Sequence, residues 1–249
     1  MTELKEVPAP SDQSEHGRPV SSHSGEPSKD WNPRNFETLF TLGQGNYGKV
    51  YLVEALQTKQ LYAMKVRSKA VVQDCQELDS AGAEKEVLLL AKRDKHPFVV
   101  EVYGGFQTQS HIMLYMEFCP GGSLMYYLQR QGKFDTQTTR FYAGEVCLAL
   151  KWFHEQNVLY RNLCLDDILL ATDGHIKLVD FVVSKVNLDH EAGTKTFCGS
   201  AEFMAPEVLL DRYYNSSVDW WQLGIITYQM LVGKSPFTGE NLDRIYDAY

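Results

Sequence analysis

Two short stretches in the second half of the chain place the strongest constraint on its fold. Residues 160–170 read YRNLCLDDILL, and residues 179–183 read VDFVV. Each is an apolar, strand-like run interrupted by polar residues, so we expect the polar groups to lie on a loop held between buried anchors. These two loops are where we expect chemistry to take place.

The two stretches resemble the catalytic loop of protein kinases, HRDLxxxN, and their metal-binding DFG turn. In that family the loop Asp accepts the proton of the substrate hydroxyl, and the Asn holds a magnesium ion. This chain carries Asn162 and Asp167 at those positions. A neutral amide is not basic at pH 7, so Asn162 can only orient a hydroxyl, and the general base is missing.

Two more positions depart from the family pattern. Cys164 stands where active kinases carry a Lys that faces the transferred phosphate, and losing one positioned donor costs a factor on the order of a hundred or more. Together with Asp167, this makes the loop negative, which favours a cation over a triphosphate. Asp180 is retained as a magnesium ligand, but Val182 replaces the Gly and should stiffen the turn, because a β-branched residue reaches the angles of Gly only with strain.

Composition excludes several classes of protein. The chain has 249 residues, 44% of them hydrophobic and 22% charged, which is typical of one or two globular lobes. It has no apolar run of membrane-spanning length and no signal pattern, so we expect a cytoplasmic or nuclear protein. The net charge of -8 argues against a nucleic-acid surface. The five cysteines have no CxxC spacing, which indicates free thiols.

The first 34 residues are rich in Pro, Ser, Glu and Gly and poor in aliphatic residues. Such a segment has too little apolar surface to offset the entropy of ordering, so we predict a disordered tail. We interpret it as a plain linker; a phosphorylated docking segment is the alternative.

A glycine-rich pattern follows, with GQGNYGKV at residues 43–50 and LYAMKV ending at Val66. A Gly-rich turn between strands lets backbone N–H groups approach phosphates closely, and Lys65 can pair with the α and β phosphates. The combination predicts a nucleotide site. The alternatives are a hairpin without a ligand and a solvated Lys65.

Residues 80–92 predict a helix, and Glu84 lies 19 positions after Lys65. It resembles the helix Glu whose ion pair with that Lys marks an assembled kinase site. Glu86 is the competing candidate, and a solvated Glu84 is a third interpretation.

Residues 99–107 and 111–118 predict two strands, followed by MEFCPGGSL. This segment resembles the kinase hinge, which implies that Met116 is the gatekeeper and that Glu117 to Cys119 offer backbone groups to adenine. Ser123 stands where related kinases usually carry an acidic residue that contacts ribose. We interpret His96 as a residue that packs in a turn.

The spacing of apolar residues in 136–156 predicts a long core helix. These apolar residues are Phe141, Val146, Leu148, Leu150 and Trp152. A second buried helix is expected from Asp219 to Gly233.

Between the metal-binding turn and that second helix, TKTFCGSAEFMAPE resembles the activation segment of AGC-group kinases. The resemblance implies that Thr196 is a phosphorylation site whose phosphate Arg161 captures. The alternative is an ordinary loop Thr. Glu207 would ordinarily pair with an Arg from a region beyond residue 249, so we expect an unpaired carboxylate.

The resemblance covers residues 36–249 and is densest with the protein kinase C and protein kinase N branch. It implies an α+β, two-lobed fold that is truncated at its C-terminus, with a tail (1–34), a small lobe (35–118) and a partial large lobe (119–249). It also implies ATP and Mg²⁺ as cofactors and proteins as partners or substrates. The nucleotide contacts it implies are Gly43, Gln44, Gly45, Gly48, Val50, Ala63, Lys65, Met116, Glu117, Cys119 and Leu169, with Asp167 and Asp180 for metal.

Three functions are compatible with these residues. The first is a pseudokinase that binds nucleotide, transfers phosphate poorly and acts through partners. The second is a weakly active serine/threonine kinase in which Asp167 reaches the substrate hydroxyl. The third is a truncated interaction protein without a stable large lobe.

Overall fold

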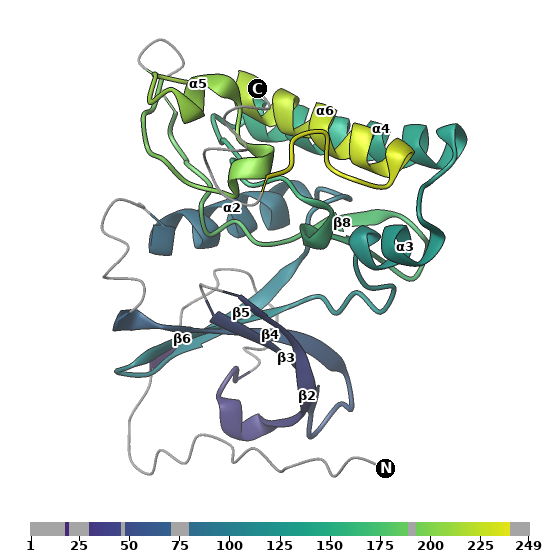
Figure 1. Ribbon diagram of the computed structural model, residues 1–249. Coiled ribbons are helices and arrows are strands. Elements are labelled where there is room, and N and C mark those ends of the chain that lie inside the picture. The colour runs from purple at the N-terminus through teal and green to yellow at the C-terminus, as the bar shows by residue number, and fades with distance from the viewer. Residues whose placement is uncertain (1–17, 20–29, 46–47, 71–79, 189–192, 240–249) are drawn as a thin grey trace. The chain divides into compact units, whose positions relative to one another are not determined.

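The computed structural model describes residues 18–19, 30–45, 48–70, 80–188 and 193–239. The chain divides into two compact units, one formed by residues 1–70 with 104–115 and the other by residues 71–103 with 116–249. The first unit is built mainly of strands and the second mainly of helices (Figure 1). This composition agrees with the predicted α+β fold class.

The first unit is organised on a six-stranded sheet with the order β1-β5-β6-β4-β3-β2. The strands are β1 (Arg18–Pro19), β2 (Phe36–Gly45), β3 (Gly48–Ala55), β4 (Leu61–Ser68), β5 (Val102–Gln107) and β6 (His111–Met116). Strands β2, β3 and β4 pair antiparallel in sequence order. The glycine-rich segment therefore joins two adjacent strands, as predicted.

An aromatic cluster packs on this sheet and begins before the predicted end of the tail. Trp31 contacts Phe36 and Tyr62 with ring centroids 5.8 and 5.5 Å apart, and Phe36 stacks on Tyr115 at 4.5 Å. A Cβ at Gly104 would lie 2.2 Å from the Trp31 indole nitrogen, so only glycine leaves room for that ring. Because burial of aromatic surface orders this segment, the packed part starts before the predicted boundary at residue 34. The remainder of the predicted tail, apart from β1, lies outside the described residues.

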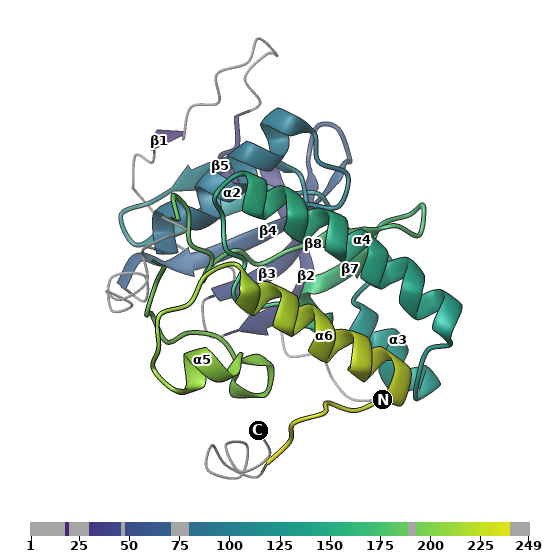
Figure 2. The same ribbon diagram turned by 90° about the horizontal axis from the view of Figure 1, so that it is seen from above.

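The second unit is mainly helical. Its helices are α2 (Ser80–Asp94), α3 (Leu124–Gln131), α4 (Thr136–Glu155), α5 (Pro206–Leu209) and α6 (Ser217–Val232), with short 3-10 turns η2 (Leu165–Asp167) and η3 (Ala201–Phe203) and a hairpin of β7 (Ile168–Leu170) and β8 (Ile176–Leu178). A further 3-10 turn, η1 (Pro33–Asn35), belongs to the first unit. Helices α4 and α6 lie side by side (Figure 2).

The ends of the two long helices carry the expected caps. The Asp135 carboxylate accepts a hydrogen bond from Thr138 N at 2.7 Å at the start of α4. Gly233 ends α6 with a φ of 87°, a left-handed conformation that glycine adopts without strain. Both long helices were predicted close to their observed bounds.

The prediction that all apolar residues of α4 lie in the core is wrong for two of them. Val146 and Leu150 are fully buried, but Phe141 and Leu148 are 47% and 57% exposed. The helix buries only one side, so part of its apolar set faces outward.

His96 packs in a turn, as predicted. Its ring centroid lies 4.7 Å from that of Trp152, and its Nδ1 accepts a hydrogen bond from Phe98 N at 3.3 Å.

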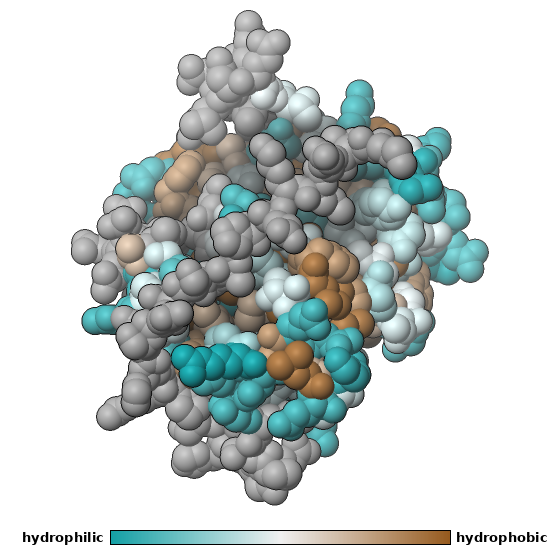
Figure 3. All heavy atoms as spheres, turned by 90° about the horizontal axis from the view of Figure 1, so that it is seen from below, coloured by the Kyte–Doolittle hydropathy of each residue, from teal (hydrophilic) through white to brown (hydrophobic). Residues whose placement is uncertain are grey.

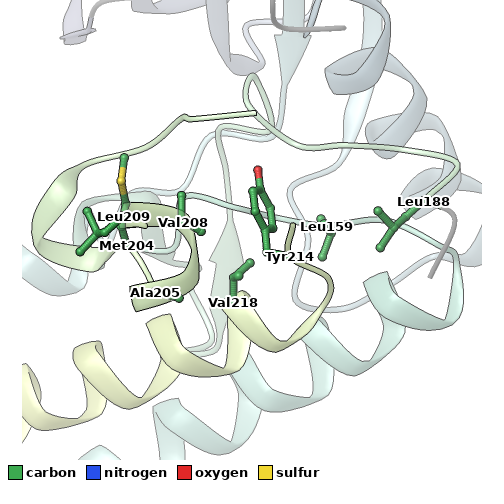
Figure 4. Packing of buried hydrophobic residues seen from close by; sticks show 8 residues of the cluster. All are labelled: Leu159, Leu188, Met204, Ala205, Val208, Leu209, Tyr214 and Val218. Carbon is green, nitrogen blue, oxygen red and sulfur yellow. The ribbon is translucent and has the colours of Figure 1, made fainter. Parts of the chain in front are cut away.

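A hydrophobic cluster joins the catalytic loop to the activation segment and to α6 (Figure 4). Its members are Leu159, Leu188, Met204, Ala205, Val208, Leu209, Tyr214 and Val218. Because these residues come from segments far apart in sequence, their burial fixes the start of the catalytic loop and the activation segment against helix α6.

The carboxylate of Glu207 accepts a hydrogen bond from Ser217 Oγ at 3.2 Å, while its lack of an Arg partner stays a prediction. The four cysteines in the described part are free thiols: Cys119, Cys147, Cys164 and Cys198. Cys75 lies outside that part.

Among the described helices none has the length and apolarity needed to span a bilayer. Hydrophobic and hydrophilic residues lie next to one another on the face shown in Figure 3.

Candidate functional site

The backbone of the catalytic loop is fastened to α6. The carboxylate of Asp219, which is fully buried, accepts hydrogen bonds from Tyr160 N at 3.0 Å and Arg161 N at 2.8 Å, and it contacts His154 Nε2 at 2.8 Å. The loop therefore has a fixed path.

A second side chain of α6, Gln222, secures the next step of the same loop. Its Oε1 accepts from Leu163 N at 2.9 Å, and its Nε2 donates to Arg161 O at 2.9 Å. Since one amide satisfies both a donor and an acceptor of the loop, the position between them, Asn162, is held from both sides.

Arg161 connects the catalytic loop to the metal-binding loop. It is buried and adopts a φ of 70°. Its guanidinium donates to the carbonyl oxygens of Val183 and Ser184, the latter at 3.3 Å, and lies 3.5 Å from the Tyr214 hydroxyl. Ser184 Oγ donates back to Tyr160 O at 3.3 Å. The two loops predicted to carry the chemistry are thus held together.

The three departures in the catalytic loop form one cluster. Oδ2 of Asp167 accepts from Cys164 Sγ at 3.1 Å and lies 3.5 Å from Asn162 Nδ2. Burial, together with the neighbouring Asp167 carboxylate, raises the pKa of the Cys164 thiol well above its ordinary value. The thiol therefore stays protonated and acts as a donor, and the anion of the cluster is at Asp167 rather than at position 162.

The loop predicted to bind metal has one unusual backbone angle, which lies at Asp180. Asp180 has a φ of 60°, whereas Val182 does not adopt a positive φ. Val182 is buried, and its N–H donates to Asp180 Oδ1 at 3.3 Å. The prediction that Val182 limits the flipping of this turn stays a prediction.

The residues predicted to hold Mg²⁺ have suitable donor chemistry. Both Asp167 and Asp180 supply carboxylate oxygens, which are the ligands that Mg²⁺ prefers. Val179 N donates to Asp167 O at 3.0 Å, so the residue just before Asp180 is tied to Asp167. In the described part of the chain, no group of three or more His, Cys, Asp or Glu side chains has the arrangement of a metal site. A metal here would accordingly take its remaining ligands from phosphate and water.

In the first unit, the predicted phosphate-binding residues lie on the β2–β3–β4 meander. Gly43 pairs with Val50, Gln44 with Lys49 and Gly45 with Gly48 across the hairpin. A Cβ at Gly48 would lie 2.4 Å from Val66 O, so this position requires glycine.

The neighbouring strand β4 carries the other two predicted nucleotide contacts of this unit. Lys65 pairs with Val50 across β3 and β4, and both Lys65 and Ala63 are buried. The structure thus brings the glycines, Val50 and Lys65 of this unit together.

Helix α2 distinguishes the two candidate glutamates. Glu84 is buried, whereas Glu86 is exposed. This burial favours Glu84. Because Glu84 and Lys65 belong to different units, their ion pair stays a prediction.

Two backbone groups of residues 117–119, which resemble the kinase hinge, make no hydrogen bond to another described residue. Glu117 N donates to Glu101 O at 2.9 Å, but no hydrogen bond between described residues engages the carbonyl of Glu117 or the N–H of Cys119. Met116 and Cys119 are buried. Leu169 on β7 forms an antiparallel β-bridge with Ser123. This predicted nucleotide contact therefore lies next to the end of the hinge segment.

The activation segment approaches the catalytic loop at Tyr214 and Gly199. The Tyr214 hydroxyl donates to Thr196 O at 2.6 Å and lies beside Arg161, and burial raises the pKa of Tyr214 to about 12. A Cβ at Gly199 would lie 3.2 Å from Arg161 O. Thr196 and Arg161 thus share Tyr214 as a neighbour, while capture of a phosphate stays a prediction.

Sequence reasoning missed the residues that hold the loop. The sequence pattern predicts the helices that carry Asp219, Gln222 and His154 but assigns these residues no role, and it assigns none to Tyr214. A buried-helix pattern that contains an Asp and a Gln was the available signal, because polar groups in a core need partners.

Comparison with known proteins agrees with the geometry. The family described as "Protein kinase domain" matches residues 36–248. The chain is 50% identical over 214 residues to "Protein kinase C-like" of Cochliobolus heterostrophus, covering 86% of this chain and 18% of that protein. It is 48% identical to "Protein kinase C-like 2" of Schizosaccharomyces pombe, again covering 86% of this chain but 21% of the relative.

A third relative is "Atypical protein kinase C" of Drosophila melanogaster, which is 43% identical over 219 residues, covering 86% of this chain and 36% of that protein. The chain spans about a fifth of the length of the first two relatives. The predicted resemblance to the protein kinase C branch of AGC kinases is confirmed, and the chain belongs to the protein kinase domain family.

Proposed function

We propose that this chain is a serine/threonine kinase domain of the protein kinase C-like type that binds ATP with Mg²⁺ but transfers phosphate poorly, and that acts in the cytoplasm or nucleus by binding partner proteins. One observation carries the proposal. The position that must accept a proton holds the amide of Asn162, whose backbone neighbours are fastened to Asp219 and Gln222. Loss of a general base costs a factor of about 100 to 10,000.

Nucleotide binding is supported in each unit separately. In the first, Gly48 must be glycine and Lys65 lies across from Val50. In the second, the carbonyl of Glu117 and the N–H of Cys119 offer one acceptor and one donor, a pattern that matches the donor and acceptor edge of adenine. We expect the two units to contribute phosphate and base contacts respectively.

Metal binding is supported by Asp167 and Asp180. These carboxylates would hold Mg²⁺, which would offset the negative charge of the phosphates. The carboxylate of Asp167, where the family carries an amide, adds a negative charge that favours the cation. The protonated Cys164 thiol offsets this charge only through one hydrogen bond.

The activation segment supplies a regulatory proposal. A phosphate on Thr196 would be a dianion near neutral pH, and Arg161 is a suitable partner whose guanidinium already faces the same Tyr214 hydroxyl. Phosphopeptide mapping of the protein from cells should detect modified Thr196; consistently unmodified Thr196 removes this part.

One experiment tests fold, pocket and metal site together. Thermal unfolding of the 249-residue chain is followed with ATP, with and without Mg²⁺. A cooperative transition that ATP raises, and that Mg²⁺ raises further, supports the proposal, because only a folded site gains stability from ligand. Absence of a cooperative transition would instead favour the truncated interaction protein.

A paired assay tests the loss of catalysis. We expect incorporation of labelled phosphate into a peptide panel to equal that of Lys65→Met. Incorporation that exceeds the background and disappears in Lys65→Met would overturn the inactive part of the proposal.

A weakly active kinase is the second candidate, and the loop cluster favours it. The carboxylate of Asp167 lies 3.5 Å from the amide of Asn162, so an anion is present next to the position of the missing base. In this alternative Asp167 accepts the proton while Asp180 alone holds metal. Residual activity that Asp167→Asn leaves unchanged would exclude it.

A further inference from the structure

The second unit contains a largely buried ion pair that the roles assigned above do not use. Lys177 Nζ on β8 lies 3.0 Å from Glu117 Oε2, and the two side chains are only 18% and 25% exposed. By comparison, Lys151 Nζ and Glu155 Oε1 are 3.8 Å apart, and their side chains are 68% and 59% exposed. Because water screens the first pair less, removing one of its partners should cost more than removing one partner of the exposed pair.

The carboxylate of Glu117 belongs to the same residue whose carbonyl has no hydrogen-bond partner among the described residues. Its Oε2 also accepts from Glu101 N at 3.4 Å, while Glu117 N donates to Glu101 O at 2.9 Å. Glu117 is therefore held by its backbone and by its side chain, and Lys177 is the only cation within ion-pair distance of it in the described part of the chain. Removing Lys177 would leave a largely buried carboxylate with one long hydrogen bond.

Lys177 in turn lies on the strand that leads into the metal-binding loop. It pairs with Leu169 across β7 and β8 and precedes Asp180 by three positions. The same hairpin holds the far end of the hinge, because Gly121 N donates to Leu170 O at 3.1 Å and Leu170 N to Gly122 O at 2.8 Å. Glu117 and Gly121 are thus both tied to β7–β8, one at each end of the hinge.

We propose that Lys177 is a positioning residue for the nucleotide: through its ion pair with Glu117 it fixes the hinge on the β8 strand that continues to Asp180, so that the adenine-facing and metal-facing groups are held in register. This inference rests on the proposed function of the hinge. It predicts that the pair affects binding of the adenine end of a ligand and the mobility of the hinge.

The test uses the 249-residue chain with Lys177→Met, which keeps the length of the side chain but removes its charge. The matched control is Lys151→Met, which removes an exposed ion pair. Binding of Mg²⁺·ATP and of adenosine is measured by calorimetry below the unfolding temperature of each variant. We expect Lys177→Met to weaken both ligands by the same factor, about three- to thirtyfold, and Lys151→Met to leave both unchanged.

Two further variants separate positioning from a loss of folding. Glu117→Gln breaks the pair from the other side with a side chain of the same shape, and it should weaken binding to a similar degree. The charge-swapped double variant Glu117→Lys with Lys177→Glu should recover most of the affinity. Well-folded Lys177→Met and Glu117→Gln proteins with unchanged affinity would overturn the inference.

Hydrogen exchange decides the inference independently of nucleotide binding. In the ligand-free protein, amides of residues 117–123 should exchange faster in Lys177→Met than in the wild type, and at the wild-type rate in Lys151→Met. If the wild type binds neither ligand, the proposed function fails while a faster hinge still supports the positioning pair. Unchanged exchange in this segment rejects it.

Discussion

The two sides of the catalytic loop differ in how far they keep a kinase pattern. On the side that faces α6, Asp219 and Gln222 accept hydrogen bonds from backbone N–H groups of residues 160–163. Leu163 and Leu165 of the same loop are fully buried. The other side carries Asn162, Cys164 and Asp167, which all depart from the pattern. Because stability depends on the first side and proton transfer on the second, the loop can keep its fold while its chemistry changes.

The largest expected effect comes from exchanging the residue types at two of the three departed positions, 162 and 167. In Asn162→Asp with Asp167→Asn, a carboxylate returns to the held position and an amide to the metal position. We expect the rate of phosphate transfer to a peptide to rise by about 100- to 10,000-fold, because a general base is restored. The rate should stay below that of an ordinary kinase, since Cys164 still replaces a Lys.

The control for this exchange is the same double variant with Lys65→Met, which should return to background. A double variant that binds Mg²⁺·ATP but transfers no more phosphate than the wild type would show that the base is not what limits the reaction.

The next effect concerns the side that faces α6. Asp219→Ala leaves the N–H groups of Tyr160 and Arg161 buried without their acceptor, and we expect it to lower the free energy of unfolding by about 2–5 kcal/mol. Asp166→Ala, which removes an exposed carboxylate from the same loop, should change it by less than about 0.5 kcal/mol. Chemical denaturation measures both; equal effects would mean that α6 does not hold the loop.

A smaller effect is expected on the departed side. Cys164→Ala removes one hydrogen bond to Asp167, and we expect a loss of at most about 1.5 kcal/mol in the free energy of unfolding. If this variant is as unstable as Asp219→Ala, the departed cluster supports the fold, and the contrast between the two sides of the loop disappears.

The smallest effect is pH-dependent and lies on another helix. The Glu145 carboxylate on α4 raises the pKa of His175 above its ordinary value by hydrogen bonding. A raised folded pKa gives stability that is full below the unfolded pKa of about 6.5 and is lost as the pH rises through the folded pKa. The difference in unfolding temperature between wild type and His175→Gln should therefore be larger at about pH 6 than at about pH 8. A difference that does not change with pH would contradict this pair.

Much of the fold could be predicted from the sequence because it depends on local patterns. The glycine-rich hairpin and the helix ending at Gly233 follow from residues close in sequence. The exposure of Phe141 and Leu148 could not be predicted, because the spacing of apolar residues indicates a helix but not which neighbours cover each of them. The positive φ of Asp180 was not predicted for a similar reason, since the path of the turn depends on the loops around it.

The sequence by itself determined which chemical groups this protein has at its reactive positions, since an amide at 162, a thiol at 164 and carboxylates at 167 and 180 are fixed covalently. Only the tertiary structure decided how those groups are held. The bonds from Tyr160 and Arg161 to Asp219 join residues 59 and 58 positions apart. Such contacts form only when α6 packs beneath the loop, and no local pattern encodes them.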